Sequence, residues 1–212
     1  MRQKIMITVG LLAALGFVAG SLFHLPVLSI LTKPLPVLLL VFTVADFPRT
    51  TYRNWVLVGL AFSVAGDIFL SAGDEMFLYG LVYFLIGHLA YIGAYISSKS
   101  PTKLLPLLLC IAWGSTAFLI LKPNLGELMI PVVVYVAVIC TMMWRASCCL
   151  GQGDWARLAF VGALLFVISD TILAFDRFYT PFAWAQVAVL VLYWSGQTAI
   201  ALSARPVANK TG

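Results

Sequence analysis

Eight apolar stretches follow one another along the chain, each close to the roughly 20 residues that cross the hydrocarbon of a bilayer. Short connections rich in Gly, Pro, Asn and Asp separate them. Of the 212 residues 62% are hydrophobic and only 10% are charged, against about 25% charged in soluble domains. We therefore expect a single integral membrane domain over residues 1–212, an all-α polytopic transmembrane helix bundle. The expected spans are 5–25, 27–47, 55–72, 76–97, 104–121, 128–144, 158–175 and 182–203.

The Lys and Arg residues between these spans predict their orientation. With eight spans, ten basic residues fall on one side of the membrane and three on the other, namely Lys33, Lys122 and Arg177. Cytoplasmic loops carry the excess of basic residues, so both termini are expected in the cytoplasm. The net charge of +5 is explained by this topology and by anionic lipid headgroups, and it does not indicate a nucleic-acid partner.

Two of the apolar stretches match each other. Gly59 is followed eight residues later by Asp67 and then three residues later by a leucine, and the same spacing recurs from Gly162 to Asp170, 103 residues further on. We interpret the match as two equivalent helices of a parallel internal repeat, four spans plus four, each bringing one acid to the same depth.

A carboxylate in hydrocarbon is costly, so an intramembrane acid is a functional candidate. Asp67 lies fourteen residues after Arg53, and Asp170 lies thirteen after Arg157. At about 1.5 Å per residue, both acids lie about 20 Å from the cytoplasmic edge. Lys33, thirteen residues from the cytoplasmic end of its span, reaches a similar depth. The three groups are expected to converge on one layer, although Lys33 would also be explained by snorkelling to the outer headgroups.

Further polar side chains in these spans are candidates for contacting a substrate, because helices that line a wet cavity carry such residues. Some also have a structural explanation: His88 as a hydrogen bonder between helices, and Tyr91, Tyr193 and Trp194 as packing or interface groups. The candidates besides Lys33 are Ser63, Tyr83, His88, Tyr91, Ser169, Gln186, Tyr193 and Trp194.

The chain resembles the lysoplasmalogenase (YhhN-like) family of multi-span membrane proteins over nearly its whole length. The two segments that end in Asp67 and Asp170 are the most specific parts of this resemblance. The other matching segments are Lys33–Pro36, Phe77–Gly80, Gly87–Tyr91, Met143–Ala146, Leu173–Asp176 and Tyr193.

The resemblance implies eight spans and hydrolysis of the vinyl ether bond of lysoplasmalogens, with Asp67 and Asp170 as the catalytic pair. The products would be a fatty aldehyde and glycerophosphocholine or glycerophosphoethanolamine. The expected partners are this lysophospholipid and membrane lipids, and the expected location is a bacterial inner membrane or, in a eukaryote, the endoplasmic reticulum. No cofactor or metal is expected.

Two carboxyl groups suit this reaction, because a vinyl ether is cleaved only after its β-carbon is protonated. In a site of low polarity the pair shares one proton, so that one group acts as general acid. The other group stabilises the oxocarbenium ion and accepts a proton from the attacking water. The spacing alone does not say which aspartate has which role.

Three other functions remain open from the residues alone. Asp67 and Asp170 would also serve a proton-coupled lipid or small-molecule transporter built from repeats. They would form a zinc site with His88, although the chain has only two histidines. An intramembrane aspartyl protease is disfavoured, because Ala65-Gly66-Asp67 lacks a Gly-x-Gly-Asp signature.

Overall fold

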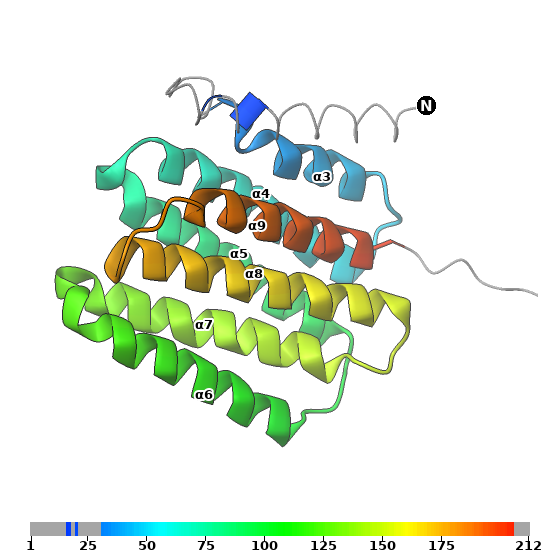
Figure 1. The fold of residues 1–212 in the computed structure, drawn as a ribbon. Helices are drawn as coiled ribbons and strands as arrows, with labels where there is room; N and C mark the ends of the chain where they lie inside the picture. Colours follow the sequence, from blue (N-terminus) through cyan, green and yellow to red (C-terminus); the bar gives the residue numbers. More distant parts are fainter. Residues whose placement is uncertain (1–15, 18–19, 21–30, 206–212) are drawn as a thin grey trace, which may run out of the picture.

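The structure of this chain is a computed structural model that describes residues 16, 17, 20 and 31–205. In this part every regular element is helical, and six helices are long and apolar enough to cross a membrane (Figure 1). The elements are α3 (Leu35–Ala45), α4 (Thr51–Ser71), α5 (Phe77–Ser97), α6 (Leu104–Leu121), α7 (Met129–Cys148), α8 (Asp154–Phe178) and α9 (Ala185–Ser203), with 3₁₀ turns at Asp74–Met76, Lys122–Asn124 and Gly126–Leu128.

Local sequence determines where the long helices begin and end. The side chain of Thr50 caps α4 by accepting a hydrogen bond of 3.1 Å from the backbone N–H of Arg53. Gly73 and Gly153 follow α4 and precede α8 with φ of 126° and 114°, a region that glycine adopts without a Cβ clash. These tight connections place consecutive helices side by side and antiparallel.

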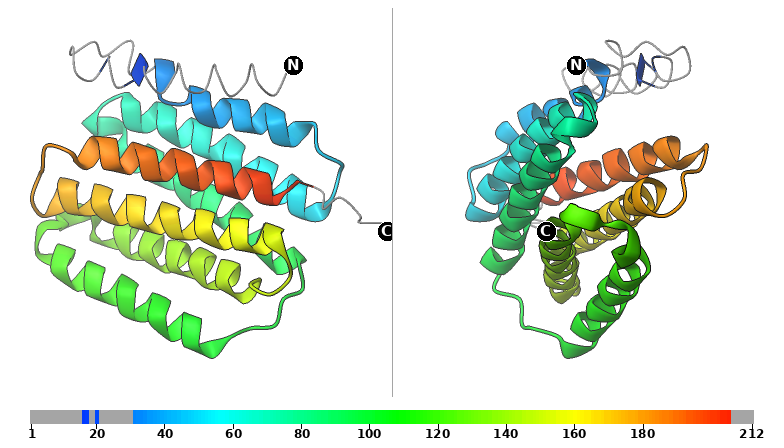
Figure 2. Two further views of the ribbon diagram at one scale, coloured as in Figure 1. Left: turned by 45° about the vertical axis from the view of Figure 1, so that its right-hand side comes forward. Right: turned by 90° about the vertical axis from the view of Figure 1, so that its left-hand side faces the viewer.

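The helices form one bundle in which consecutive long helices run in opposite directions (Figures 1 and 2). The most extensive packing joins α4 to α5 and α8 to α9, while α7 contacts α5, α6 and α8. α6 lies at one edge of the bundle and makes only a small contact with α8. In α6 only Gly114 and Leu121 are buried, so this helix is the most open of the long helices to lipid.

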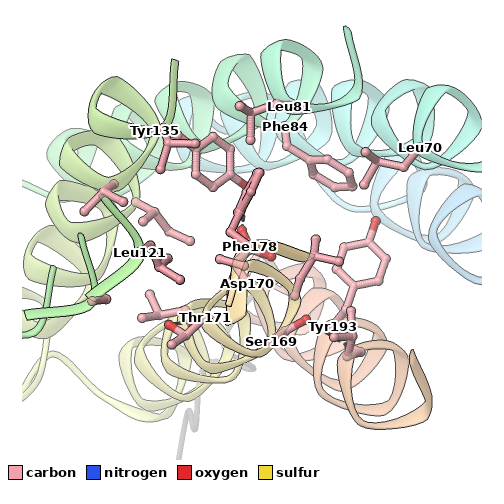
Figure 3. Close-up of a pocket in the computed structure, with 18 of the residues that line it drawn as sticks. Leu70, Leu81, Phe84, Leu121, Tyr135, Ser169, Asp170, Thr171, Phe178 and Tyr193 are labelled. Atoms are coloured by element: carbon pink, nitrogen blue, oxygen red, sulfur yellow. Dashed lines mark hydrogen bonds between the residues drawn. The ribbon is translucent and has the colours of Figure 1, made fainter. Parts of the chain in front are cut away.

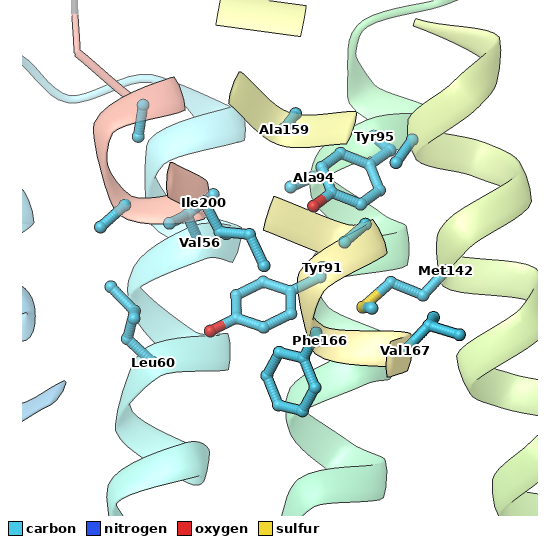
Figure 4. Close-up of a cluster of buried hydrophobic side chains, with 14 of the residues drawn as sticks. Val56, Leu60, Tyr91, Ala94, Tyr95, Met142, Ala159, Phe166, Val167 and Ile200 are labelled. Atoms are coloured by element: carbon cyan, nitrogen blue, oxygen red, sulfur yellow. The ribbon is translucent and has the colours of Figure 1, made fainter. Parts of the chain in front are cut away.

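The interior is filled with aromatic and aliphatic side chains from α4, α5, α7, α8 and α9. Figure 4 shows Leu60, Tyr91, Met142, Phe166 and Ile200 in this core, and all five are fully buried. On the outside of the bundle, large apolar side chains are exposed, as is typical of a surface that faces lipid. The expected all-α membrane bundle is therefore confirmed for the described residues.

The first glycine of each matched segment marks a close approach between helices. A Cβ on Gly59 would lie 2.3 Å from the ring of Tyr91 on α5, and a Cβ on Gly162 would lie 2.7 Å from the carbonyl oxygen of Gly196 on α9. Glycine at these positions lets α4 pack on α5 and α8 on α9 at short range.

Several helix boundaries differ from the expected ones: α7 ends at Cys148 and not at 144, α8 ends at Phe178 and not at 175, and α9 begins at Ala185 and not at 182. α4 and α8 both begin four residues earlier than expected, because Thr50 and Gly153 set their starts. The expected span 27–47 is interrupted, since Lys33 and Pro34 form a turn and α3 begins only at Leu35. The proline there lacks an N–H and would clash with a preceding helical turn. Apart from residues 16, 17 and 20, the expected span 5–25 lies outside the described residues.

Candidate functional site

A cavity occupies the half of the bundle in which α4, α6 and α8 end and α5, α7 and α9 begin. All six long helices line it, and Lys33 joins them from the turn before α3. Its volume is about 1080 Å³ with the open space at its mouth included. Figure 3 shows its largely apolar wall, to which Leu70, Leu81, Phe84, Leu121 and Phe178 belong.

Asp67 brings the first carboxyl group to this cavity from the last turns of α4. The residue is 1% exposed, and the hydroxyl group of Tyr193 on α9 donates a hydrogen bond of 2.7 Å to its Oδ2. Tyr193 was expected to contact substrate, and it also lines the cavity. The same side chain therefore fixes the orientation of Asp67.

Asp170 on α8 brings the second carboxyl group. The hydroxyl group of Tyr135 on α7 donates a hydrogen bond of 2.5 Å to its Oδ2, as seen in Figure 3. Asp170 and Asp67 line one cavity. Each acid thus has one tyrosine hydroxyl donor, and each donor belongs to a different helix from its acid. The catalytic role of the two acids stays a prediction.

Lys33 and Ser169 also line the cavity. Lys33 therefore borders the same cavity as Asp67. Ser169, next to Asp170 in the chain, donates a hydrogen bond of 2.9 Å to the carbonyl oxygen of Val189 on α9. This bond ties α8 to α9 at the level of the acids.

Ser63 and Tyr91, which were expected to contact substrate, do not line this cavity, and hydrogen bonds hold both side chains elsewhere. The hydroxyl group of Ser63 donates to the carbonyl oxygen of Gly59 at 2.9 Å, within α4. That of Tyr91 donates to Oε1 of Gln197 at 2.6 Å, within the buried core.

Four more of the expected contacts lie outside the cavity lining: Tyr83, His88, Gln186 and Trp194. Tyr83 stacks on the ring of Phe69 at 4.8 Å, and Gln186 is exposed. His88 is fully buried, with its ring 4.6 Å from that of Phe166. The ring nitrogens of His88 and Nε1 of Trp194 have no hydrogen-bond partner within residues 31–205. Aromatic packing, rather than contact with the cavity, fixes Tyr83 and His88.

Sequence reasoning missed Tyr135, Trp113 and Thr171, all of which line the cavity. The indole Nε1 of Trp113 on α6 donates a hydrogen bond of 3.3 Å to Oγ1 of Thr171 on α8. Trp113 is 51% exposed, so the cavity reaches the outer surface of the bundle between these two helices. Tyr135 is the only tyrosine in α7. This isolated polar group in an apolar helix is the one sequence signal that would have indicated a role in the site.

The arrangement offers general acid–base chemistry in an apolar chamber. Two carboxyl groups with hydroxyl donors can exchange protons with a molecule placed between them. In the described part of the chain, no group of three His, Cys, Asp or Glu side chains is arranged to hold a metal ion. His88, considered as a third zinc ligand, packs against aromatic rings instead.

Comparison of the sequence with known protein families finds a match. The profile of the YhhN family matches residues 28–204 of this chain. The lysoplasmalogenase TMEM86A of Bos taurus is 36% identical to it over 156 residues, which are 70% of this chain and 64% of that protein. The lysoplasmalogenase TMEM86B of Rattus norvegicus is 34% identical over 180 residues, 83% of this chain and 72% of that protein.

The similarity extends to bacteria. The lysoplasmalogenase of Mycobacterium bovis is 29% identical over 162 residues, 68% of this chain and 60% of that protein. The chain thus spans between 60% and 72% of the length of these three relatives. No solved structure matches the chain.

Proposed function

Because this chain belongs to the YhhN family, we propose that it is a membrane-embedded lysoplasmalogenase. It hydrolyses the vinyl ether bond of lysoplasmalogen to a fatty aldehyde and glycerophosphocholine or glycerophosphoethanolamine. One observation carries the proposal: two carboxyl groups from different helices, Asp67 and Asp170, line a single apolar cavity. Relatives that bear the name lysoplasmalogenase support it.

The reaction proceeds by proton transfer between the acids and the substrate. One carboxyl group gives its proton to the β-carbon of the vinyl ether, and an oxocarbenium ion forms. The other carboxylate stabilises this cation and takes a proton from the water that adds to it. The hemiacetal then collapses to aldehyde and glycerol alcohol, and the two carboxyl groups regain their starting protonation states.

The shape of the cavity suits a lipid with a single chain. Apolar walls from six helices favour burial of the alkenyl chain, while the acids and tyrosine hydroxyl groups gather in one region of the lining. The headgroup remains at the outer end of the bundle, where the connections with Asp74, Lys122 and Arg177 lie.

The substrate reaches the cavity from the bilayer, between α6 and α8. Support comes from the small contact between these helices and from the exposed hydrogen bond between Trp113 and Thr171 that bridges them. Because a lysolipid is already dissolved in the bilayer, lateral admission avoids transfer of its chain through water.

The proposal includes an eight-span topology with both termini in the cytoplasm and a parallel repeat of four plus four spans. The 103-residue spacing of Asp67 and Asp170, and the parallel direction of α4 and α8, favour the repeat. Lys99 and Lys103 lie in the connection after α5, and Arg145 and Arg157 lie in the adjoining ends of α7 and α8. These basic residues gather at one end of the bundle and favour a cytoplasmic orientation for that end.

Aldehyde release from lysoplasmalogen by the purified protein tests the proposal. Asp67→Asn and Asp170→Asn are each expected to lower turnover at least about a hundredfold, the scale of general acid–base catalysis. Asp154→Asn is the matched control, because the Asp154 side chain is 93% exposed and does not line the cavity. Normal turnover in either variant would contradict the two-acid mechanism, and lipid transport into liposomes without cleavage would favour a transporter.

A further inference from the structure

An ion pair at the outer end of the bundle joins the connection after α4 to the last turn of α8. Nη1 of Arg177 donates a hydrogen bond of 2.9 Å to Oδ1 of Asp74. The two residues are 103 positions apart, the same separation as Asp67 and Asp170, and each follows its acid by seven residues. The pair therefore occupies equivalent positions of the two matched segments, beyond the carboxyl groups of the cavity.

The guanidinium group of Arg177 lies against the wall of the cavity. Its Cζ is 3.9 Å from the centroid of the Phe77 ring and 5.9 Å from that of the Phe178 ring. The two rings contact each other edge to face, and both line the cavity, where Figure 3 shows Phe178. Contact with the rings holds the cation in place. The Arg177 side chain is still 31% exposed, so a ligand at this end of the cavity can reach it.

The bond between Arg177 and Asp74 is open to exchange. The Asp74 side chain is 90% exposed, and water competes for the charges of such a surface pair. The bond uses a single N–H group of the guanidinium fork, whereas a phosphate accepts two N–H groups in parallel. A phosphate can therefore replace the carboxylate on Arg177 and leave Asp74 to pair with another cation.

The distance from the acids to this pair matches the length of a glycerol phosphate. α8 is helical from Asp170 to Arg177, and these seven residues advance about 10 Å along its axis. In a lysoplasmalogen seven bonds separate the β-carbon of the vinyl ether from phosphorus, about 8 Å in an extended chain at roughly 1.2 Å per bond. A lipid whose vinyl ether lies beside Asp170 thus carries its phosphate to the level of Arg177.

We propose that Asp74 and Arg177 form a headgroup subsite that selects a zwitterionic headgroup, phosphoethanolamine or phosphocholine. The inference rests on the proposed function and assigns the polar end of its substrate. Arg177 donates two hydrogen bonds to the phosphate, and Asp74 pairs with the ammonium or trimethylammonium group. Both charges of the ion pair then keep opposite partners. A headgroup with a phosphate and no cation would place like charge beside Asp74, which disfavours it.

Binding of uncleavable analogues to the purified protein in detergent tests this subsite without catalysis. The probes are three alkyl ether lipids of one chain length: alkyl glycerophosphoethanolamine, alkyl glycerophosphoglycerol, which has no cation, and alkylglycerol, which has no phosphate. Native mass spectrometry measures each Kd, and the unaltered protein should prefer the ethanolamine probe. Arg177→Gln is expected to raise Kd for this probe about tenfold or more and to leave Kd for alkylglycerol unchanged. Asp74→Asn is expected to abolish the preference for ethanolamine over the glycerol headgroup.

Arg157→Gln and Asp154→Asn are the matched controls, because Arg157 and Asp154 form an exposed ion pair of 3.4 Å at the other end of α8. Neither should change Kd for any probe. Equal weakening of all three probes in Arg177→Gln would show that the pair only supports the fold, and it would overturn the proposal. An unchanged headgroup preference in Asp74→Asn would overturn it too. This substitution at an exposed side chain decides the question if Arg177→Gln does not fold.

Kinetics connects the subsite to the reaction. Arg177→Gln is expected to raise KM for lysoplasmalogen about tenfold or more and to change kcat less than about twofold, because the headgroup is bound alike in the ground state and the transition state. A lowered kcat with an unchanged KM would contradict a headgroup role. A protein that binds the ethanolamine probe selectively and releases no aldehyde would end the proposed function and leave the subsite standing.

Discussion

At the scale of single residues, the tyrosine hydroxyl groups hold the two acids in place. Tyr193→Phe and Tyr135→Phe each remove one donor to a carboxyl oxygen while keeping the ring. Hydrogen bonds to charged groups contribute about 1.5–3 kcal/mol, so kcat is expected to fall roughly tenfold or more in each variant. Steady-state aldehyde release measures the effect.

Tyr79→Phe provides the control for these variants, because Tyr79 is 57% exposed on the outside of α5 and does not line the cavity. Its turnover is expected to equal that of the unaltered protein. Equal turnover in all three variants would mean that neither acid depends on its tyrosine donor.

Among single residues, the acids were predictable from sequence and their partners were not. Asp67 and Asp170 stand out because a carboxyl group in an apolar span is energetically costly and therefore indicates a functional site. Tyr135 does not stand out, since a tyrosine in a span is equally explained by packing. The depth of Tyr91 and His88 follows from their position along a helix. The direction in which they point follows from helix rotation, which depends on the packing of α5 with α4 and α7 and on ring contacts with Phe166 of α8.

At the scale of helices, the small contact between α6 and α8 is the expected passage for the alkenyl chain. Ala117 on α6 lines the cavity and is half-buried, one turn beyond Trp113. Ala117→Trp is expected to lower kcat/KM for long-chain lysoplasmalogen in bilayers about tenfold or more by filling this passage. A short-chain, water-soluble vinyl ether should keep most of its turnover.

Ala112→Trp is the matched control, because Ala112 is exposed on the same helix and does not line the cavity. Kinetics with both substrates compares the two variants. A loss that is equal for long and short chains, or equal in both variants, would contradict lateral admission between α6 and α8.

The helices themselves were the most predictable level of this structure. Apolar stretches of membrane length, separated by glycine and proline, predict helices because the backbone must satisfy its own hydrogen bonds in lipid. The break at Lys33 and Pro34 was not predicted, because hydropathy counts the stretch 27–47 as one continuous span. A proline interrupts a helix without changing the apolar composition of the stretch. Which helices neighbour each other is decided by side-chain packing and not by hydropathy.

At the scale of the whole molecule, the proposed orientation predicts which connections face the cytoplasm. A cysteine introduced as Gln152→Cys should react with a membrane-impermeant maleimide only after the membrane is opened, and one introduced as Asn124→Cys should react in intact cells. The native cysteines lie in spans or are buried, so their background is low. The reverse labelling pattern would show that the topology is inverted. Labelling of both cysteines on the same side would contradict a membrane crossing by α7, which lies between them.

The central claim is that proton transfer to carbon begins the cleavage of a vinyl ether in this cavity. Its most direct measurement is the mass of the aldehyde that purified protein releases from lysoplasmalogen in deuterated water, trapped at once by reduction. The account predicts one solvent-derived deuterium on the carbon next to the carbonyl group. An aldehyde without deuterium at that carbon, or a protein that releases no aldehyde, would contradict it.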